Sequence, residues 1–205
     1  ATGAPGTQQA VAMAMSSRLG VGNSRFHYGG SAGPSDTVYL GVFRRSALDR
    51  VGGFDETLLR NQDYELNWRI RDSGGEVWFE PAMVVTYRPR PSLRALASQY
   101  RQYGTWKRVM LKRHPRSLRA RQLVAPVMVV GVTGTAAVAA WTEDPRWLLP
   151  AVTYAAAVTV GGLAAGRSAP TVSRIRVPAA LAVMHWAWGL GFLFGRPVPP
   201  PVAED

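Results

Sequence analysis

The segment VYLGVFRRSALDRVGGFDETLLRNQDYELNWRIRDSGG (residues 38–75) decides the fold. It predicts a strand over residues 38–43 and a short helix over 46–51, followed by a glycine-rich turn. A second helix is predicted from Asp63 to Arg71, because the Ser-Gly-Gly that follows it is a usual helix stop. The alternation of short strands and helices indicates an α/β unit.

Two further β-rich runs, EVWFE and AMVVTY, follow on either side of Pro81. Together with the segment above they predict a partial α/β domain over residues 1–90. Ninety residues in such short elements would form only a thin core. The chain also begins at Ala1 rather than at Met. We therefore expect it to be the C-terminal portion of a longer protein.

The last third of the chain contains three long apolar stretches, at about residues 123–141, 147–166 and 177–195. Each approaches the roughly 20 apolar residues that cross a bilayer core as a helix. They predict three transmembrane helices within residues 122–196, followed by a Pro-rich tail at 197–205. The alternative, buried helices of a soluble bundle, is disfavoured because the stretches have almost no polar face.

A basic block precedes the first apolar stretch. Eleven of the 24 lysine and arginine residues lie between Arg88 and Arg121, where there is no acidic residue, and the whole chain carries a net charge of +11. Such a block is typical of proteins that bind nucleic acid or an anionic membrane surface. Because this block directly abuts an apolar stretch, we expect membrane lipids of the anionic inner leaflet as its partner, and no nucleic acid.

The block also has an apolar stripe. In SLRALASQYRQYGTWKRVMLKR, apolar side chains recur every three or four residues, which places them on one helix face. Tyrosine and tryptophan favour the headgroup level of a bilayer, and arginine can meet lipid phosphates. This pattern predicts an amphipathic interfacial helix within residues 91–121. A solvated basic helix is the alternative.

The loops predict an orientation. The loop between the first two apolar stretches, TEDPR, is slightly acidic, whereas RSAPTVSRIR between the second and third carries three arginines and no acid. Basic loops remain in the cytoplasm. The sequence therefore predicts a multi-pass protein of the cell membrane with residues 1–120 in the cytoplasm and the tail outside.

Composition excludes several kinds of site. The chain has no cysteine, which rules out disulfides, thiolate zinc sites and a cysteine nucleophile within it. Its three histidines, His27, His114 and His185, lack the spacing of metal ligands. We predict no metal site in these residues.

Residues 38–90, in this order of motifs, resemble the acceptor half of a glycosyltransferase family 2 enzyme with the GT-A fold. The family's segment before an acidic motif looks like GVFRRSALDRVGGFDE, and its motif Glu-Asp-x-Asp/Glu-Leu appears as QDYEL, residues 62–66. With MSSRLGVGNSRFHYGG upstream, the chain looks closest to the succinoglycan-type exopolysaccharide glycosyltransferases. The resemblance covers roughly residues 10–115 and implies a nucleotide-sugar transferase.

The resemblance implies an inverting transfer with Asp63 as the catalytic base. The acceptor hydroxyl is a poor nucleophile until a base takes its proton. The alternative is that Asp63 only caps the helix that starts there. Glu65 cannot share its helix face and is expected to pair with Arg69, with a direct substrate contact as the alternative. Gln62 stands where the family usually has Glu and is also a candidate substrate-binding residue.

Other residues are candidate substrate contacts. Arg44 and Arg45 could meet an anionic donor or a lipid diphosphate. Gln99, Arg101 and Gln102 stand where processive relatives have Gln-x-x-Arg-Trp, although the match is loose.

The resemblance also implies a donor half with a DxD motif that holds Mg²⁺ or Mn²⁺, and no DxD occurs in this sequence. We therefore expect the chain alone to bind no metal and to be inactive. The predicted function is transfer of a sugar from a nucleotide-diphosphate donor to a lipid-linked saccharide acceptor at the cytoplasmic face, for exopolysaccharide or cell-envelope glycan synthesis. The alternatives are a degenerate, non-catalytic membrane module and a cationic membrane-surface binding protein.

Overall fold

The structure, a computed structural model, describes residues 2–198, except for the side chain of Arg25. Most of the predicted tail, 197–205, therefore lies outside the described residues. The elements in chain order are α1 (Thr7–Met15), α2 (Arg18–Val21), η1 (Arg25–His27), β1 (Gly33–Pro34), α3 (Arg45–Val51), α4 (Gln62–Asp72), β2 (Trp78–Phe79), α5 (Leu93–Arg113), η2 (Pro115–Ser117), η3 (Ala120–Gln122), α6 (Val124–Thr142), η4 (Pro145–Leu148), α7 (Leu149–Ala165), α8 (Thr171–Arg174) and α9 (Val177–Phe194).

Helix α4 matches its prediction to within a residue at each end. Its stop is the predicted one, since Gly74 has a left-handed φ of 83° and the Gly75 amide donates to the Ile70 carbonyl at 2.8 Å. One face of α4 buries Leu66 and Ile70, which pack with Val77. Partly buried side chains from the preceding segment complete this small core: Val38, Phe43, Leu48 and Val51.

The α/β prediction is confirmed only in part, because the described residues are mostly helical. Their sheet is a single antiparallel pair, in which Gly33 lies opposite Phe79 and Pro34 opposite Trp78. The predicted strands over 38–43 and 82–87 are wrong for the part of the chain that the structure describes. A strand requires a neighbour for its backbone N–H and C=O groups, and these segments lie beside none. Val42 and Val84 are each 82% exposed.

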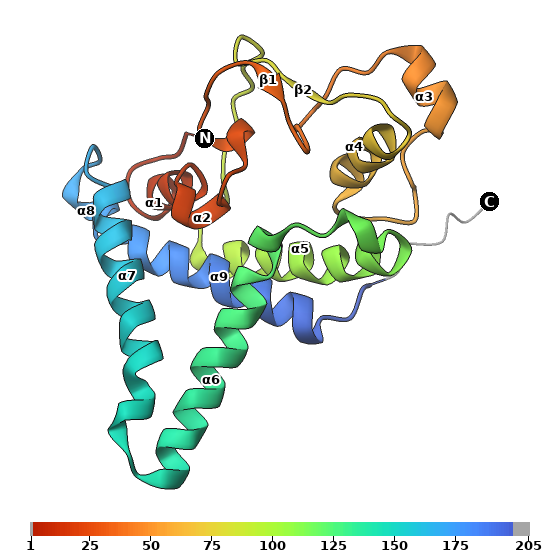
Figure 1. Cartoon of the computed structure of the whole chain (residues 1–205). Helices are drawn as coiled ribbons and strands as arrows, with labels where there is room; N and C mark the ends of the chain where they lie inside the picture. The colour runs from red at the N-terminus through yellow and green to blue at the C-terminus, as the bar shows by residue number, and fades with distance from the viewer. Residues whose placement is uncertain (1, 199–205) are drawn as a thin grey trace.

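The larger core joins the N-terminal and C-terminal parts of the chain. Helix α9 lies alongside α5 and also contacts α1, α6 and α7, and we call these helices the helical layer (Figure 1). The buried side chains of this core come from α1, α5, α7 and α9: Ala10, Val11, Ala14, Met15, Leu96, Tyr100, Val158, Val177, Ala180, Leu181 and Met184. The proposed boundaries between residues 1–90, 91–121 and 122–196 stay predictions.

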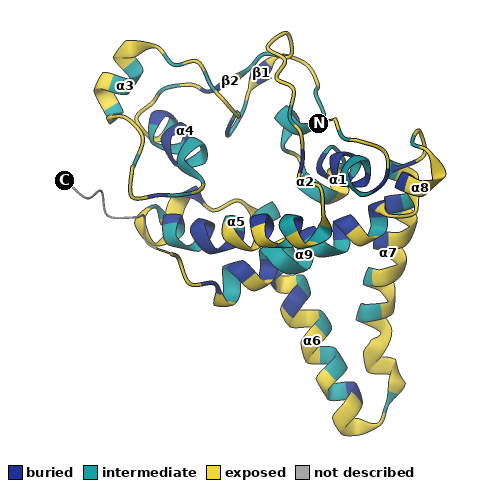
Figure 2. Ribbon diagram, turned by 180° about the vertical axis from the view of Figure 1, so that it is seen from behind, coloured by how far each residue is buried: buried dark blue, intermediate teal, exposed yellow. Residues whose placement is uncertain are grey.

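Helices α6 and α7 form a hairpin that extends away from this core, and their outward surfaces are largely exposed (Figure 2). By length and composition, three helical segments could cross a membrane: Ala120–Thr142, Pro145–Ala165 and Thr171–Phe194. The third differs from the others in its packing, because 33% of its most apolar window is buried, against 17% and 11%.

Candidate functional site

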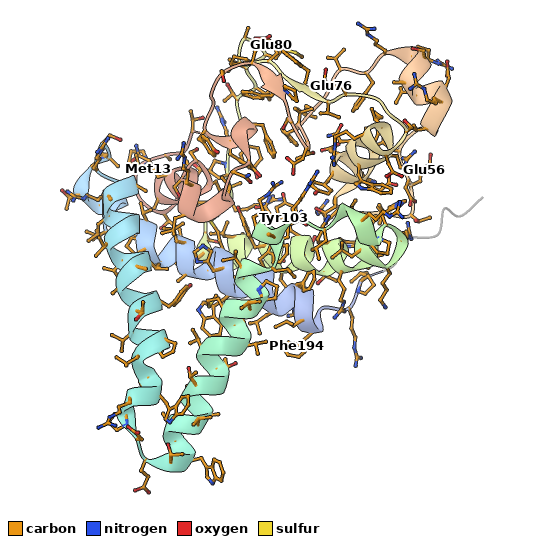
Figure 3. The ribbon with its side chains drawn as sticks, in the orientation of Figure 1. Met13, Glu56, Glu76, Glu80, Tyr103 and Phe194 are labelled. Carbon is orange, nitrogen blue, oxygen red and sulfur yellow. The ribbon has the colours of Figure 1, made fainter. Side chains whose placement is uncertain are left out.

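A cleft of about 1350 Å³ separates the small core around α4 from the helical layer below it. Its upper wall comes from residues 37–44, one face of α4 and the segment 75–80, and its lower wall from α5 and the facing ends of α6, α7 and α9. Tyr103 of α5 and, from the opposite wall, Glu76 and Glu80 all line it (Figure 3). The cleft therefore lies where the N-terminal part of the chain meets the apolar helices.

Asp63 lines this cleft from the first turn of α4. The N-cap of the helix is Asn61, which has a left-handed φ of 65° and makes no side-chain capping bond. Its amide instead donates to the Tyr103 carbonyl at 3.1 Å, which ties the start of α4 to α5. Asn61 thus occupies the cap position that was the alternative role for Asp63.

The environment of Asp63 suits a proton acceptor. Burial raises the pKa of its carboxyl above the usual range, and no hydrogen bond or cation among the described residues offsets that shift. A partly buried carboxylate without a partner retains its lone pairs for a ligand. It also has a pKa closer to neutrality than a solvated aspartate.

Glu65 has a different surrounding from Asp63. It is 2% exposed and lies against Arg69, whose Nε donates to Oε1 at 2.7 Å, and against His114, whose Nε2 lies 2.9 Å from the same oxygen. Arg69 also donates to the Gly53 carbonyl at 2.7 Å and to the Val51 carbonyl. The predicted Glu65–Arg69 pair is confirmed, and it anchors α4 to the glycine-rich turn after α3.

Lys107 is a cleft residue that sequence reasoning missed. Its side chain is 3% exposed, and Nζ lies 3.8 Å from the centroid of the Tyr64 ring and 3.4 Å from Ser117 Oγ. Burial, and secondarily the positive charge of Arg121, lower its pKa to about 7. In the sequence it is one of eleven basic residues in a block, and nothing in the spacing distinguishes it from the others.

The segment aligned with Gln-x-x-Arg-Trp contributes to the cleft indirectly. Gln99 Nε2 donates to the hydroxyls of Tyr87 at 3.1 Å and Tyr103 at 2.7 Å, and both tyrosines line the cleft. Arg101 is exposed on α5, and Gln102 accepts a hydrogen bond of 3.2 Å from Arg60. Gln99 therefore positions two aromatic side chains of the wall.

The two candidate arginines, Arg44 and Arg45, lie in different environments. Arg44 is exposed and lines the cleft. Arg45 points its guanidinium at Asp49, 2.8 Å away on the outer side of α3. Of the predicted site residues, Asp63 and Arg44 belong to the cleft lining, whereas Gln62, Glu65, Arg45, Gln99, Arg101 and Gln102 lie outside it among the described residues.

The described residues contain no group of three or more His, Asp or Glu side chains that could hold a metal ion. The divalent metal that the resemblance implies would bind a DxD motif, which this sequence does not contain, and it stays a prediction for a donor half.

Comparison with known proteins adds to this geometry. The family model described as glycosyl transferase family 21 matches residues 37–195. The succinoglycan biosynthesis protein ExoA of Rhizobium meliloti (strain 1021) is 31% identical over 189 residues, which cover 90% of this chain and 55% of that protein. The pre-mycofactocin glycosyltransferase of Mycobacterium tuberculosis (strain ATCC 25618 / H37Rv) is 33% identical over 90 residues, 44% of this chain and 18% of that protein.

The chain thus spans about half the length of the first of these relatives. No solved structure matches it. The matching model is that of family 21, and the resemblance to family 2 stays a prediction. The family model covers Asp63, all three apolar helices and the part of the cleft lining that lies after residue 36. On this match, the chain belongs to glycosyl transferase family 21.

Proposed function

We propose that this chain forms the acceptor side of a membrane-anchored inverting glycosyltransferase, with Asp63 as the base. The sugar would come from a nucleotide-diphosphate donor and go to a lipid-linked saccharide at the cytoplasmic face, for exopolysaccharide or cell-envelope glycan synthesis. Family membership supports a transferase. The name of the Rhizobium relative, a succinoglycan biosynthesis protein, supports a glycan product.

The observation that carries the proposal is the position of Asp63 in a cleft with an apolar floor. Asp63 is partly buried there and has no cation partner among the described residues. Val124 and Met128 of α6 and Ala157 and Val158 of α7 line the same cleft as Asp63. The cleft thus has a carboxylate on one wall and apolar side chains of α6 and α7 on the other, which suits an amphiphilic acceptor. The acceptor hydroxyl would lie against Asp63, and its lipid chain would lie along α6 and α7.

In this mechanism Asp63 takes the proton of the acceptor hydroxyl as that oxygen attacks the anomeric carbon of the donor sugar. The bond from the anomeric carbon to the diphosphate oxygen breaks in the same step, and the nucleoside diphosphate leaves with the electron pair. Arg44, at the rim of the cleft, is the residue we assign to an anionic group of donor or acceptor. The basic residues before α6 support a cytoplasmic location.

The test is sugar transfer by the full-length protein in membranes, with radiolabelled nucleotide sugars and the lipid-extractable product counted. Asp63→Asn is expected to reduce transfer by roughly 10²–10⁴-fold, the usual contribution of a general base. Asp49→Asn is the matched control, because Asp49 lies 59% exposed on α3 outside the cleft lining.

If the wild-type protein transfers sugar and the Asp63→Asn variant does so at the same rate, Asp63 is not the base. A wild-type protein inactive with every donor would favour the degenerate module instead. If lipid binding depends on the basic block while transfer is absent, the membrane-surface binding protein is the better description.

A further inference from the structure

The α6–α7 hairpin has the dimensions of a complete membrane crossing. Helix α6 has 19 residues, and at about 1.5 Å of rise per residue it is roughly 28 Å long, close to the thickness of a bilayer core. Its side chains face outward, with Val127 65% and Val130 57% exposed, as does Val152 of α7 at 61%. Hydrocarbon is the partner whose chemistry fits this surface.

The two ends of the hairpin are polar in different ways. At the tip, Glu143, Asp144 and Arg146 are flanked by Trp141, 85% exposed, and Trp147, 47% exposed. Tryptophan beside charged residues is typical of a membrane–water interface. At the other end, the charged residues in the segments that flank the helix termini are basic, and one of them, Arg121, pairs with Asp36: Arg119, Arg121, Arg167, Arg174 and Arg176. The hairpin thus has an interface at each end, one helix length apart.

Helix α9 runs across the base of this hairpin instead of alongside it (Figures 1 and 2). Its first half is buried against the N-terminal part of the chain, since Val177, Ala180 and Leu181 are 0% exposed and share a core with α1. His185 Nε2 also lies 2.9 Å from the Leu19 carbonyl oxygen. Crossing the membrane beside α6 and α7 would require α9 to leave this core.

The second half of α9 packs on α5 at backbone distance. A Cβ on Gly104 of α5 would collide with the Trp188 carbonyl, and one on Gly191 of α9 with the Arg101 carbonyl. Thr105 Oγ1 donates to the Gly191 carbonyl at 3.2 Å, and Arg108 Nη1 donates to the Leu193 carbonyl at 2.6 Å. The two helices therefore lie side by side up to the end of α9.

Helix α5 constrains where this pair can lie. Its exposed surface carries Arg94, Arg101, Lys112 and Arg113. Charged side chains in the hydrocarbon core are costly, so α5 must remain at the surface of the bilayer. Because the second half of α9 is joined to α5, it is held at the surface too, with its remaining apolar side chains toward the lipid. Phe194, 69% exposed, is one of these (Figure 3).

We propose that only α6 and α7 cross the membrane, and that α5 and α9 form a two-helix platform parallel to the bilayer surface beneath the cleft. Three crossings would place the chain after Phe194 on the far side of the membrane. Two crossings place it on the same side as Asp63. The platform would hold the cleft at the depth of the lipid headgroups.

The absence of cysteine from these 205 residues allows a direct test. Single cysteines are introduced into the full-length protein as Val198→Cys after α9, Glu143→Cys at the hairpin tip and Asp49→Cys on α3, with any cysteine elsewhere replaced by serine. All three positions are exposed. Right-side-out and inside-out membrane vesicles are treated with a membrane-impermeant maleimide, and labelling is compared.

The expected result is that Val198→Cys and Asp49→Cys are labelled in the same vesicles, and Glu143→Cys in the opposite ones, each by at least about tenfold. Labelling of Val198→Cys together with Glu143→Cys would show a third crossing and overturn the proposal. Labelling of all three in the same vesicles would overturn it as well, because the hairpin would then not cross. Labelling needs no sugar transfer, so a failure of this topology can be told apart from a failure of Asp63 as the base.

Discussion

Asp63 and Glu65 lie two residues apart on α4 and therefore face different sides of the helix. Asp63 faces the cleft, whereas Glu65 is enclosed by Arg69 and His114. The Arg69 contact is predictable from the sequence, because residues four apart on a helix are neighbours. The His114 contact is not, because it joins residues 49 positions apart and depends on how α5 returns beneath α4.

Glu65→Ala is predicted to destabilise the fold by about 2 kcal/mol, since it leaves the partly buried Arg69 and His114 without their carboxylate partner. The measurement is thermal or denaturant unfolding of the detergent-solubilised protein, followed by circular dichroism. Asp49→Ala is the control, because it removes an exposed i,i+4 pair worth about 0.5 kcal/mol or less. Equal losses from the two variants would refute a structural role for the Glu65 network.

Lys107 predicts a pH dependence of stability. Its pKa is about 7 in the folded protein and about 10.4 in an unfolded chain. Between these values the unfolded state binds more protons, so the free energy of unfolding rises with pH across this window. Lys107→Met is expected to remove part of this rise and to be the more stable form at pH 7. An unchanged slope between pH 7 and 10 would contradict the assignment.

The close packing of the two helices α5 and α9 depends on glycines at their contact. Gly104→Ala is predicted to destabilise the protein by about 1–3 kcal/mol, because the added Cβ meets backbone atoms of α9 that cannot move aside. Gly131→Ala on α6 is the matched control, since no atom lies within 4 Å of its added Cβ. The measurement is the unfolding temperature of the two variants and the wild-type protein in the same detergent. A control variant as unstable as Gly104→Ala would contradict this packing.

Helices could be predicted from the sequence better than strands, because the two differ in where their backbone hydrogen-bond partners lie. Helices α4 and α5 and the apolar helices satisfy their backbone hydrogen bonds internally, so their sequence patterns predict them to within a few residues. The runs VYLGVF and AMVVTY have strand composition, but a strand also requires a neighbour, which sequence pattern alone does not supply. Hydropathy alone likewise cannot separate a helix that packs against α1 from one that spans a bilayer, because both kinds of burial require apolar residues.

The junction of cleft and hairpin makes a prediction at the scale of the whole molecule. Ala157→Trp, on α7 where it lines the cleft floor, is expected to raise the KM for a lipid-linked acceptor about tenfold while leaving the donor KM unchanged. Ala156→Trp is exposed on the same helix outside the cleft lining and serves as the control. The measurement is the KM for the acceptor and for the donor of both variants, from steady-state kinetics of the full-length protein in vesicles. Equal effects from both variants would contradict a lipid path along this floor.

The arrangement of the whole molecule could be predicted only in outline. The charge block, the apolar stretches and the motif at residues 62–66 predict a transferase domain beside a membrane. They do not predict that α1 and α9 share a core or that Lys107 is buried in the cleft, because these depend on contacts between distant segments. Such contacts determine whether Asp63 meets an acceptor that remains in the membrane.

The pH dependence of kcat/KM tests the central claim most directly, because it reports the ionisation of an essential base in the free enzyme. For the wild-type full-length protein, transfer is predicted to rise with pH through the pKa of Asp63, which burial places above that of a solvated aspartate. The residual transfer of Asp63→Asn should lack this acid limb. If Asp63→Asn retains the same limb, or transfers sugar at the wild-type rate, Asp63 is not the base.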